Sequence, residues 1–186
     1  NCKNFWSKTN MSNLRLINET TISSAVSVVD ITDVFSADFD IYKITGSALS
    51  TAGSTTYCQA RLINSAGSVT TDSSYDDAYL SCKTNASFGE AKNVNIAFWQ
   101  EFLGDADGGA EGTSGVAWLY NPFSSSSYTF HIRQTFHAQG GIYRAYKGIG
   151  VYKQTTSCTG IRIDATSLSQ DLTGGVIRTY GLRVDS

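Results

Sequence analysis

The sequence predicts an all-β protein, a jelly-roll-like antiparallel β-sandwich. Roughly ten short apolar runs follow one another, separated by stretches rich in Gly, Ser, Thr and Asn, which is the pattern of short strands and turns. The 186 residues include 10 Tyr and 9 Phe but only 1 Met, and aromatic residues suit pleated surfaces. No stretch shows a convincing helical period, and no repeat of fixed length suggests a propeller or solenoid.

The expected strands share period-two alternation or a density of β-branched and aromatic residues. In chain order they are 14–17, 21–31, 39–45, 57–64, 77–83, 94–98, 116–120, 128–137, 142–152, 159–163 and 176–184. Residues 49–55 and 65–75 read as polar loops. In 77–83 and 94–98 the expected inward side chains are Ala78, Leu80, Cys82, Val94, Ile96 and Phe98. Gly148 and Gly150 in 142–152 indicate a bulge or a close backbone approach.

Residues 115–137 form the clearest unit, two strands joined by a turn at the chain's single proline, Pro122. Proline cannot donate to a strand ladder and Asn-Pro favours a turn, so this segment is a hairpin or a sandwich corner. On the second strand, Tyr128, Phe130, Ile132 and Phe136 share one face, which we expect to lie in the core. The opposite face, expected to point outward, carries Thr129, His131, Arg133, Thr135 and His137.

The chain length suits one domain with a substantial core, which we place at residues 13–186. Residues 1–12 form a polar N-terminal arm that carries Phe5 and Trp6. Large aromatic side chains on a polar arm commonly anchor interfaces, so this arm is expected to contact a neighbouring subunit. Packing onto its own domain is the alternative.

The composition excludes some classes of partner. The net charge is −2 and no basic run occurs, so we expect no nucleic-acid binding. No apolar run approaches the roughly 20 residues of a membrane helix, so we expect no membrane partner. Only 16% of residues are charged, which is typical of a surface largely used as an interface.

The four cysteines, Cys2, Cys58, Cys82 and Cys158, show neither a C-x-x-C pair nor a zinc spacing. We interpret them as small buried side chains with reduced thiols. A bridge between Cys58 and Cys82 is possible if their strands are neighbours.

The acidic loop with Asp105, Asp107 and Glu111 suggests calcium, but position 109 is Gly and the pattern of an EF-hand is incomplete. We therefore expect a solvated loop and no metal or other cofactor.

Three features could suggest catalysis. Ser114 lies in a Gly-Thr-Ser-Gly loop, but both histidines follow it, the wrong chain order for a chymotrypsin-like triad. The carboxylate pairs Asp38/Asp40 and Asp76/Asp77 could serve a glycosidase, yet nothing in the sequence places either pair in a cleft. We expect no catalytic residues and no enzymatic activity.

The expected outer face of the strand 128–137 presents His131, Arg133 and His137. These side chains could bind a phosphate, a sugar or an acidic partner. A solvated or interface-facing strand is the simpler interpretation. With Phe5 and Trp6 they are the candidate interface residues.

Three phrases resemble small virion proteins of tailed bacteriophages, especially phages of marine and freshwater cyanobacteria. They are MSNLRLINETTISSAVSVVDITDVFSADFDIYKIT (11–45), GVAWLYNPFSSSSYTF (115–130) and GGVIRTYGLRVDS (174–186). The resemblance covers nearly all of residues 11–186 and rests on strands and corners rather than catalytic residues.

This resemblance implies a non-enzymatic virion structural protein, assembled in the host cytoplasm. We expect a capsid decoration (cement) protein, a homotrimer whose partner is the major capsid protein. The alternative that the resemblance leaves open is a carbohydrate- or receptor-binding domain of a tail fibre, with a glycan as its partner.

Overall fold

The chain folds as an antiparallel β-sandwich, which confirms the predicted fold class. The computed structural model describes residues 13–53, 56–85, 88–106, 112–139, 141–166 and 169–183. Thirteen strands and no α-helix occur within these ranges. The described part of the chain contains no helix with the length and apolarity needed to cross a membrane.

The strands follow one another through short turns and a few longer connections. They are β1 (Leu14–Ile22), β2 (Val28–Ile31), β3 (Ile41–Thr51), β4 (Thr56–Tyr57), β5 (Gln59–Asn64), β6 (Tyr75–Lys83), β7 (Gly89–Ile96), β8 (Asp105–Ala106), β9 (Thr113–Tyr120), β10 (Thr129–Gln139), β11 (Ile142–Tyr152), β12 (Cys158–Asp164) and β13 (Leu172–Leu182).

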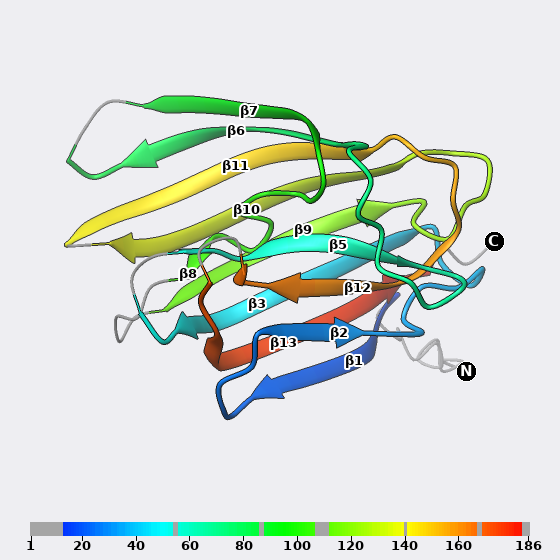
Figure 1. Cartoon of the computed structure of the whole chain (residues 1–186), viewed down its shortest axis with the longest axis horizontal. Coiled ribbons are helices and arrows are strands. Elements are labelled where there is room, and N and C mark those ends of the chain that lie inside the picture. The colour runs from blue at the N-terminus through cyan, green and yellow to red at the C-terminus, as the bar shows by residue number, and fades with distance from the viewer. Residues whose placement is uncertain are drawn as a thin grey trace, which may run out of the picture.

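Two layers of unequal size make up the sandwich. The larger sheet has the strand order β1-β13-β3-β9-β10-β11-β6-β7, and the smaller sheet has the order β2-β12-β5. Strands β4 and β8 form a separate two-stranded ribbon. Figure 1 shows β2, β12 and β5 lying across the sheet near β13, β3 and β9, with β6 and β7 at the far edge. The small sheet is therefore too narrow to cover the whole inner face of the large one.

The apolar core lies between the two layers. Its side chains come from both sheets, and fully buried members include Tyr42, Ile44, Leu119 and Ile177 from the large sheet and Leu62, Ile161 and Ile163 from the small one.

Trp99 is the largest fully buried side chain and lies where the small sheet ends. Its indole N–H donates to the Val151 carbonyl at 3.2 Å, and its ring contacts Tyr75, Phe102 and His131 at centroid distances of 5.0, 5.7 and 4.7 Å. Its backbone pairs with that of Ala60 in β5, so Trp99 ties the covering segment to both layers.

The predicted hairpin of residues 115–137 is confirmed. Strands β9 and β10 pair in antiparallel register, with Tyr120 opposite Phe130. Asn121, immediately before Pro122, adopts φ 59°, a left-handed conformation that Asn tolerates better than most residues.

Several predicted strand limits need correction. The predicted strand 94–98 overlaps only the end of β7, which runs from Gly89 to Ile96. The run 21–31 is not one strand, because β1 ends at Ile22 and β2 begins at Val28 in the other sheet. The predicted loop 49–55 begins inside β3, which continues to Thr51.

The faces of β10 are the reverse of those predicted. Phe130, Ile132 and Phe136 are 46%, 47% and 61% exposed. Thr129, His131, Arg133, Thr135 and His137, expected outside, are all 3% exposed or less. Strand β6 shows the same reversal, since Leu80 and Cys82 are exposed while Tyr75 and Asp77 are buried. Val94 in β7 is also exposed rather than inward.

The segment that covers this end of the large sheet explains the reversal. Residues 99–105, rather than a strand of the small sheet, lie over the inner face of β10 and β6. Arg133 donates to the Gln100 carbonyl, and the Gln100 N–H donates to Asp77 at 2.7 Å. Polar inward side chains are therefore stable here, because backbone groups of the covering segment pair with them.

Glycines on β11 give these inward side chains their space. Gly150 lies opposite His131 and Gly148 opposite Arg133, in an unbroken register. A Cβ at Gly150 would lie 2.2 Å from the His131 ring, and one at Gly148 would lie 3.0 Å from the Arg133 Nε. The predicted close backbone approach at these glycines is confirmed, and β11 pairs with β10 without a bulge.

Two phenylalanine truncations test the orientation of the sheet. We expect Phe102→Ala, at a fully buried site, to lower the free energy of unfolding by about 3–5 kcal/mol. Phe130→Ala, on the outer face, should lower it by less than about 1 kcal/mol. Denaturant unfolding of both variants, at a concentration where the chain is monomeric, measures the difference. A larger loss for Phe130→Ala than for Phe102→Ala would contradict the orientation.

Candidate functional site

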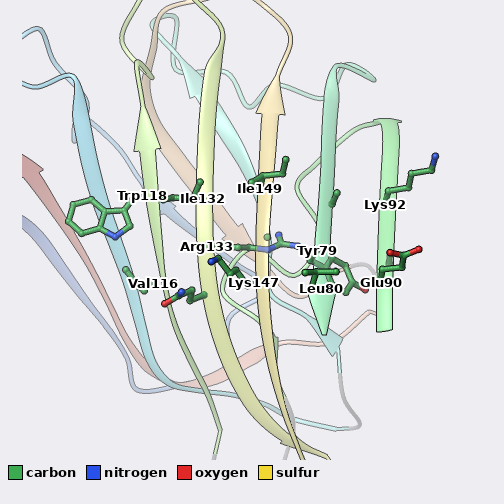
Figure 2. Close-up of a pocket in the computed structure, with 14 residues that line it drawn as sticks. Tyr79, Leu80, Glu90, Lys92, Val116, Trp118, Ile132, Arg133, Lys147 and Ile149 are labelled. Carbon is green, nitrogen blue, oxygen red and sulfur yellow. The ribbon is translucent and has the colours of Figure 1, made fainter. Parts of the chain in front are cut away.

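The outer face of the large sheet carries an unusual concentration of exposed apolar side chains. On β6, β10 and β11 these are Leu80, Phe130, Ile132, Phe136, Tyr143 and Ile149, each 46–61% exposed. A groove of about 800 Å³ runs across this face. Figure 2 shows Val116 and Trp118 at one side of the groove, Ile132, Lys147 and Ile149 along it, and Leu80, Glu90 and Lys92 at the other side. We call these residues and the six exposed apolar ones the apolar face.

Charged groups lie both within the apolar face and at its edge. Lys147 lies among its apolar side chains, and Glu90 and Lys92 lie on β7 beyond Leu80. A surface with an apolar centre and charges of both signs has the make-up of a protein–protein interface.

The inner face of the same strands is polar. Arg133, 1% exposed, lies over the Tyr79 ring with 5.5 Å between its guanidinium carbon and the ring centroid. Its guanidinium also bonds to the Gln100 carbonyl, and the negative charge of Asp77 acts on it. These partners hold a cation inside the sandwich at a site where an isolated charge would be unstable.

Two buried carboxyl groups lie beside Arg133, each bonded to a tyrosine. The Tyr79 hydroxyl lies 3.1 Å from Glu101 Oε1, and the Tyr146 hydroxyl lies 3.2 Å from Asp105 Oδ2. His137 Nε2 lies 3.3 Å from the same Asp105 oxygen. The rings of Tyr79 and Tyr146 contact each other at 4.9 Å, so the two carboxyl–tyrosine pairs form one cluster.

Burial shifts the protonation of this cluster. It raises the pKa of Glu101 to about 8, and the nearby Asp105 charge adds to this increase. Burial also raises the pKa of Asp105 to about 6. At neutral pH Glu101 is therefore mostly protonated and can donate, whereas Asp105 is mostly ionised and accepts.

His131 has a different environment. Its ring lies edge-on to Trp99 and Phe102, at centroid distances of 4.7 and 5.2 Å. Burial lowers the pKa of His131 well below its usual value, with the Arg133 charge adding to the effect. This imidazole is neutral and serves as part of the aromatic core.

The expectation that His131, Arg133 and His137 face outward as interface residues is therefore wrong. The other two candidate interface residues, Phe5 and Trp6, lie outside the described residues. The structure also separates the residues considered for catalysis. Ser114 Oγ accepts a hydrogen bond from the Ala48 N–H at 3.0 Å, and Ser114 alternates with the buried Thr113, so it does not share the face of the histidines.

The Asp76/Asp77 pair is likewise divided between the two faces of β6. Asp76 bonds to Lys153 at 2.8 Å on the outer side, while Asp77 is buried and accepts from Asn93 at 2.9 Å. Asp38 accepts from the Ser36 hydroxyl at 3.2 Å in an exposed turn.

Of the acidic loop, Asp105 belongs to the buried cluster, and Asp107 and Glu111 lie outside the described residues. Among the residues that are described, no three His, Cys, Asp or Glu side chains gather as metal ligands. Cys58 and Cys158 are buried reduced thiols, as predicted, and Cys58 is not bridged to Cys82. Cys82 is exposed, which corrects its predicted burial.

Sequence reasoning missed Tyr79, Glu101 and Tyr146, and it missed the apolar face. One signal was available: Gly148 and Gly150 alternate with Lys147, Ile149 and Val151, so the inner face of β11 carries no side chain at two positions. A neighbouring strand must then supply the large inward side chains, and on β10 these are His131 and Arg133.

The buried carboxyl groups predict a decrease in stability with rising pH. The pKa of Glu101 is raised from 4.5 to about 8 by folding, so the folded chain keeps a proton that the unfolded chain releases. The stability from this proton is fully present below pH 4.5 and is lost as pH rises toward about 8. Thermal melting at pH 6.5 and 8.0 avoids the titration of His131, whose lowered pKa gives the opposite slope below its usual value of 6.5.

We expect the Tm of the unmodified chain to fall between these two pH values by at least about 2–4 °C, the shift that each kcal/mol produces in a domain of this size. Glu101→Gln should show a markedly smaller decrease because its amide does not titrate. Glu19→Gln, at an exposed position on β1 outside the apolar face, is the matched control and should behave as the unmodified chain. Equal slopes for Glu101→Gln and Glu19→Gln would contradict the buried, protonated state of Glu101.

Searches of protein-family models, curated proteins and solved structures returned no match. No family assignment follows from them. The resemblance to phage virion proteins stays a proposal, and the site geometry provides the structural support for a function.

Proposed function

We propose that this chain is a non-enzymatic structural protein of a tailed-phage virion, a decoration protein that stabilises contacts between capsid subunits. The observation that carries the proposal is the apolar face of the large sheet. The exposure of so much apolar surface to water is unfavourable, and in an assembly a neighbouring subunit covers it.

The exposed area supports this use. The six exposed apolar side chains are each about half exposed. If a large side chain has an area of about 150–250 Å², the six together present on the order of 600 Å² of apolar surface to water. This area equals the upper end of the range for the largest apolar patch on a typical monomer. Val116 and Trp118 are partly exposed beside them. The sum approaches the roughly 800 Å² that each partner buries in a stable interface.

The occupant that we propose for the apolar face is a second copy of this chain, within a homotrimer. Glu90, Lys92 and Lys147 give the face charges of both signs. A closed ring of three is held by a heterologous contact, so the apolar face of each subunit would lie against a different surface of the next subunit. A trimer formed in this way would place its remaining surfaces against the major capsid protein on the assembled virion.

A double substitution tests the assembly. Sedimentation should give the unmodified chain three times its 20.1 kDa mass, and Ile132→Asp/Ile149→Asp should sediment as a monomer with an unchanged circular dichroism spectrum. The two aspartates would lie at the centre of the apolar face, and a neighbouring subunit that covered the face would remove their hydration. They should therefore prevent assembly. Phe88→Asp is the control, because Phe88 is 81% exposed but lies outside the strands, and it should leave the trimer intact. A monomeric unmodified chain, or a trimer that tolerates both central charges, would refute this interface.

The role on the virion needs a separate measurement. Purified trimer should co-sediment with heads of a tailed cyanobacterial phage that lack decoration protein, and it should raise the temperature at which those heads open. A trimer that binds no head and changes no opening temperature would leave the assembly intact and overturn the decoration role.

A further inference from the structure

A second cavity lies on the opposite side of the large sheet from the apolar face. It is a cleft of about 330 Å³ between the inner side of β6 and β11 and the β4–β8 ribbon. The side chains around this polar cleft include Tyr57, Tyr79, Glu101, Asp105, Arg144 and Tyr146. The proposed assembly role uses none of them.

Several polar atoms at the polar cleft have no partner within the described residues. Glu101 and Asp105 are 2% and 3% exposed, and each binds a tyrosine hydroxyl through one oxygen. Their other oxygens, Glu101 Oε2 and Asp105 Oδ1, make no hydrogen bond among the described residues, and neither does Arg144 Nε. An unsatisfied buried polar atom is destabilising, so a site with three of them is suited to a ligand that supplies donors and acceptors.

The charges around the cleft limit the class of ligand. A phosphate or carboxylate would meet the charges of Asp105 and Glu90, and a metal ion or polyamine would meet those of Lys83 and Arg144. A neutral molecule whose groups both donate and accept avoids both conflicts. Sugar hydroxyls have this property, and the apolar faces of a sugar ring can lie on tyrosine rings.

The size and the protonation of the cleft agree with a single sugar ring. Small-molecule sites begin at about 300 Å³, near the volume of this cleft. Glu101, protonated at neutral pH, can donate to one hydroxyl, and ionised Asp105 can accept from another. Arg144 offers a further donor at the same wall.

We infer that the polar cleft binds one neutral pyranose ring, with Asp105 and Glu101 bonding to its hydroxyls and Tyr57 at its border. The inference is independent of the assembly role, because Tyr57, Glu101 and Asp105 line the polar cleft and not the groove of the apolar face.

Titration calorimetry with D-glucose, D-galactose and N-acetyl-D-glucosamine tests this binding. We expect saturable binding of at least one sugar. Asp105→Asn should weaken it at least tenfold by replacing an acceptor with a donor, while Asp171→Asn, at an exposed position, should leave it unchanged. Tyr57→Phe should weaken binding at least threefold, and Tyr143→Phe on the outer face should not. The tyrosine pair keeps the test valid if Asp105→Asn fails to fold.

Three results would overturn the inference. The first is the absence of saturable binding for all three sugars. The second is equal affinity in Tyr57→Phe and Tyr143→Phe, which would place the sugar elsewhere. The third is tight binding of inorganic phosphate or spermidine at this cleft in place of sugar, which would contradict the neutral class of ligand.

Discussion

The structure depends on the burial of a polar strand face. Strand β10 turns His131, Arg133 and His137 into the sandwich and leaves Phe130, Ile132 and Phe136 outside. This arrangement is stable because segment 99–105 supplies partners: the Gln100 carbonyl for Arg133, Asp105 for His137, and the rings of Trp99 and Phe102 for His131. Side chains alternate along a strand, so the choice that buries these polar residues also exposes the apolar residues.

The two candidate sites are therefore consequences of one orientation. The apolar face and the polar cleft lie on opposite sides of β6 and β11, and Tyr79, Glu90 and Ala91 line both cavities. Gly148 and Gly150 allow both, because they leave room for Arg133 and His131 inside while Lys147 and Ile149 stand outside. A shift of one residue in the β10–β11 register would remove both sites together.

Much of the fold could be predicted from the sequence. The all-β class, the hairpin around Pro122 and the close approach at Gly148 and Gly150 follow from local chemistry: turn residues, alternation and missing side chains. Alternation also shows which residues share a face, and the grouping of Phe130, Ile132 and Phe136 was right. It does not show which face is buried. That choice depends on what covers the sheet, here a segment whose Gln100 carbonyl accepts from Arg133, 33 residues later in the sequence.

The candidate sites could not be predicted for the same reason. Glu101 follows an apolar run and Asp105 belongs to an acidic loop, and only the tertiary contacts with Tyr79 and Tyr146 bring the two carboxyl groups together. The rule that apolar residues lie inside fails at β10, because the element that covers its inner face offers polar backbone groups. The rule also fails in general on surfaces that another subunit covers.

Hydroxyl-radical footprinting, read by mass spectrometry, tests the orientation of β10 most directly, because it measures the access of water to each side chain of the folded monomer. The account predicts that Phe130 and Phe136 are oxidised in the native chain, while His131, His137 and Trp99 become reactive only on unfolding. Oxidation of His131 and His137 in the native chain, with Phe130 and Phe136 protected, would show that the sheet faces the other way.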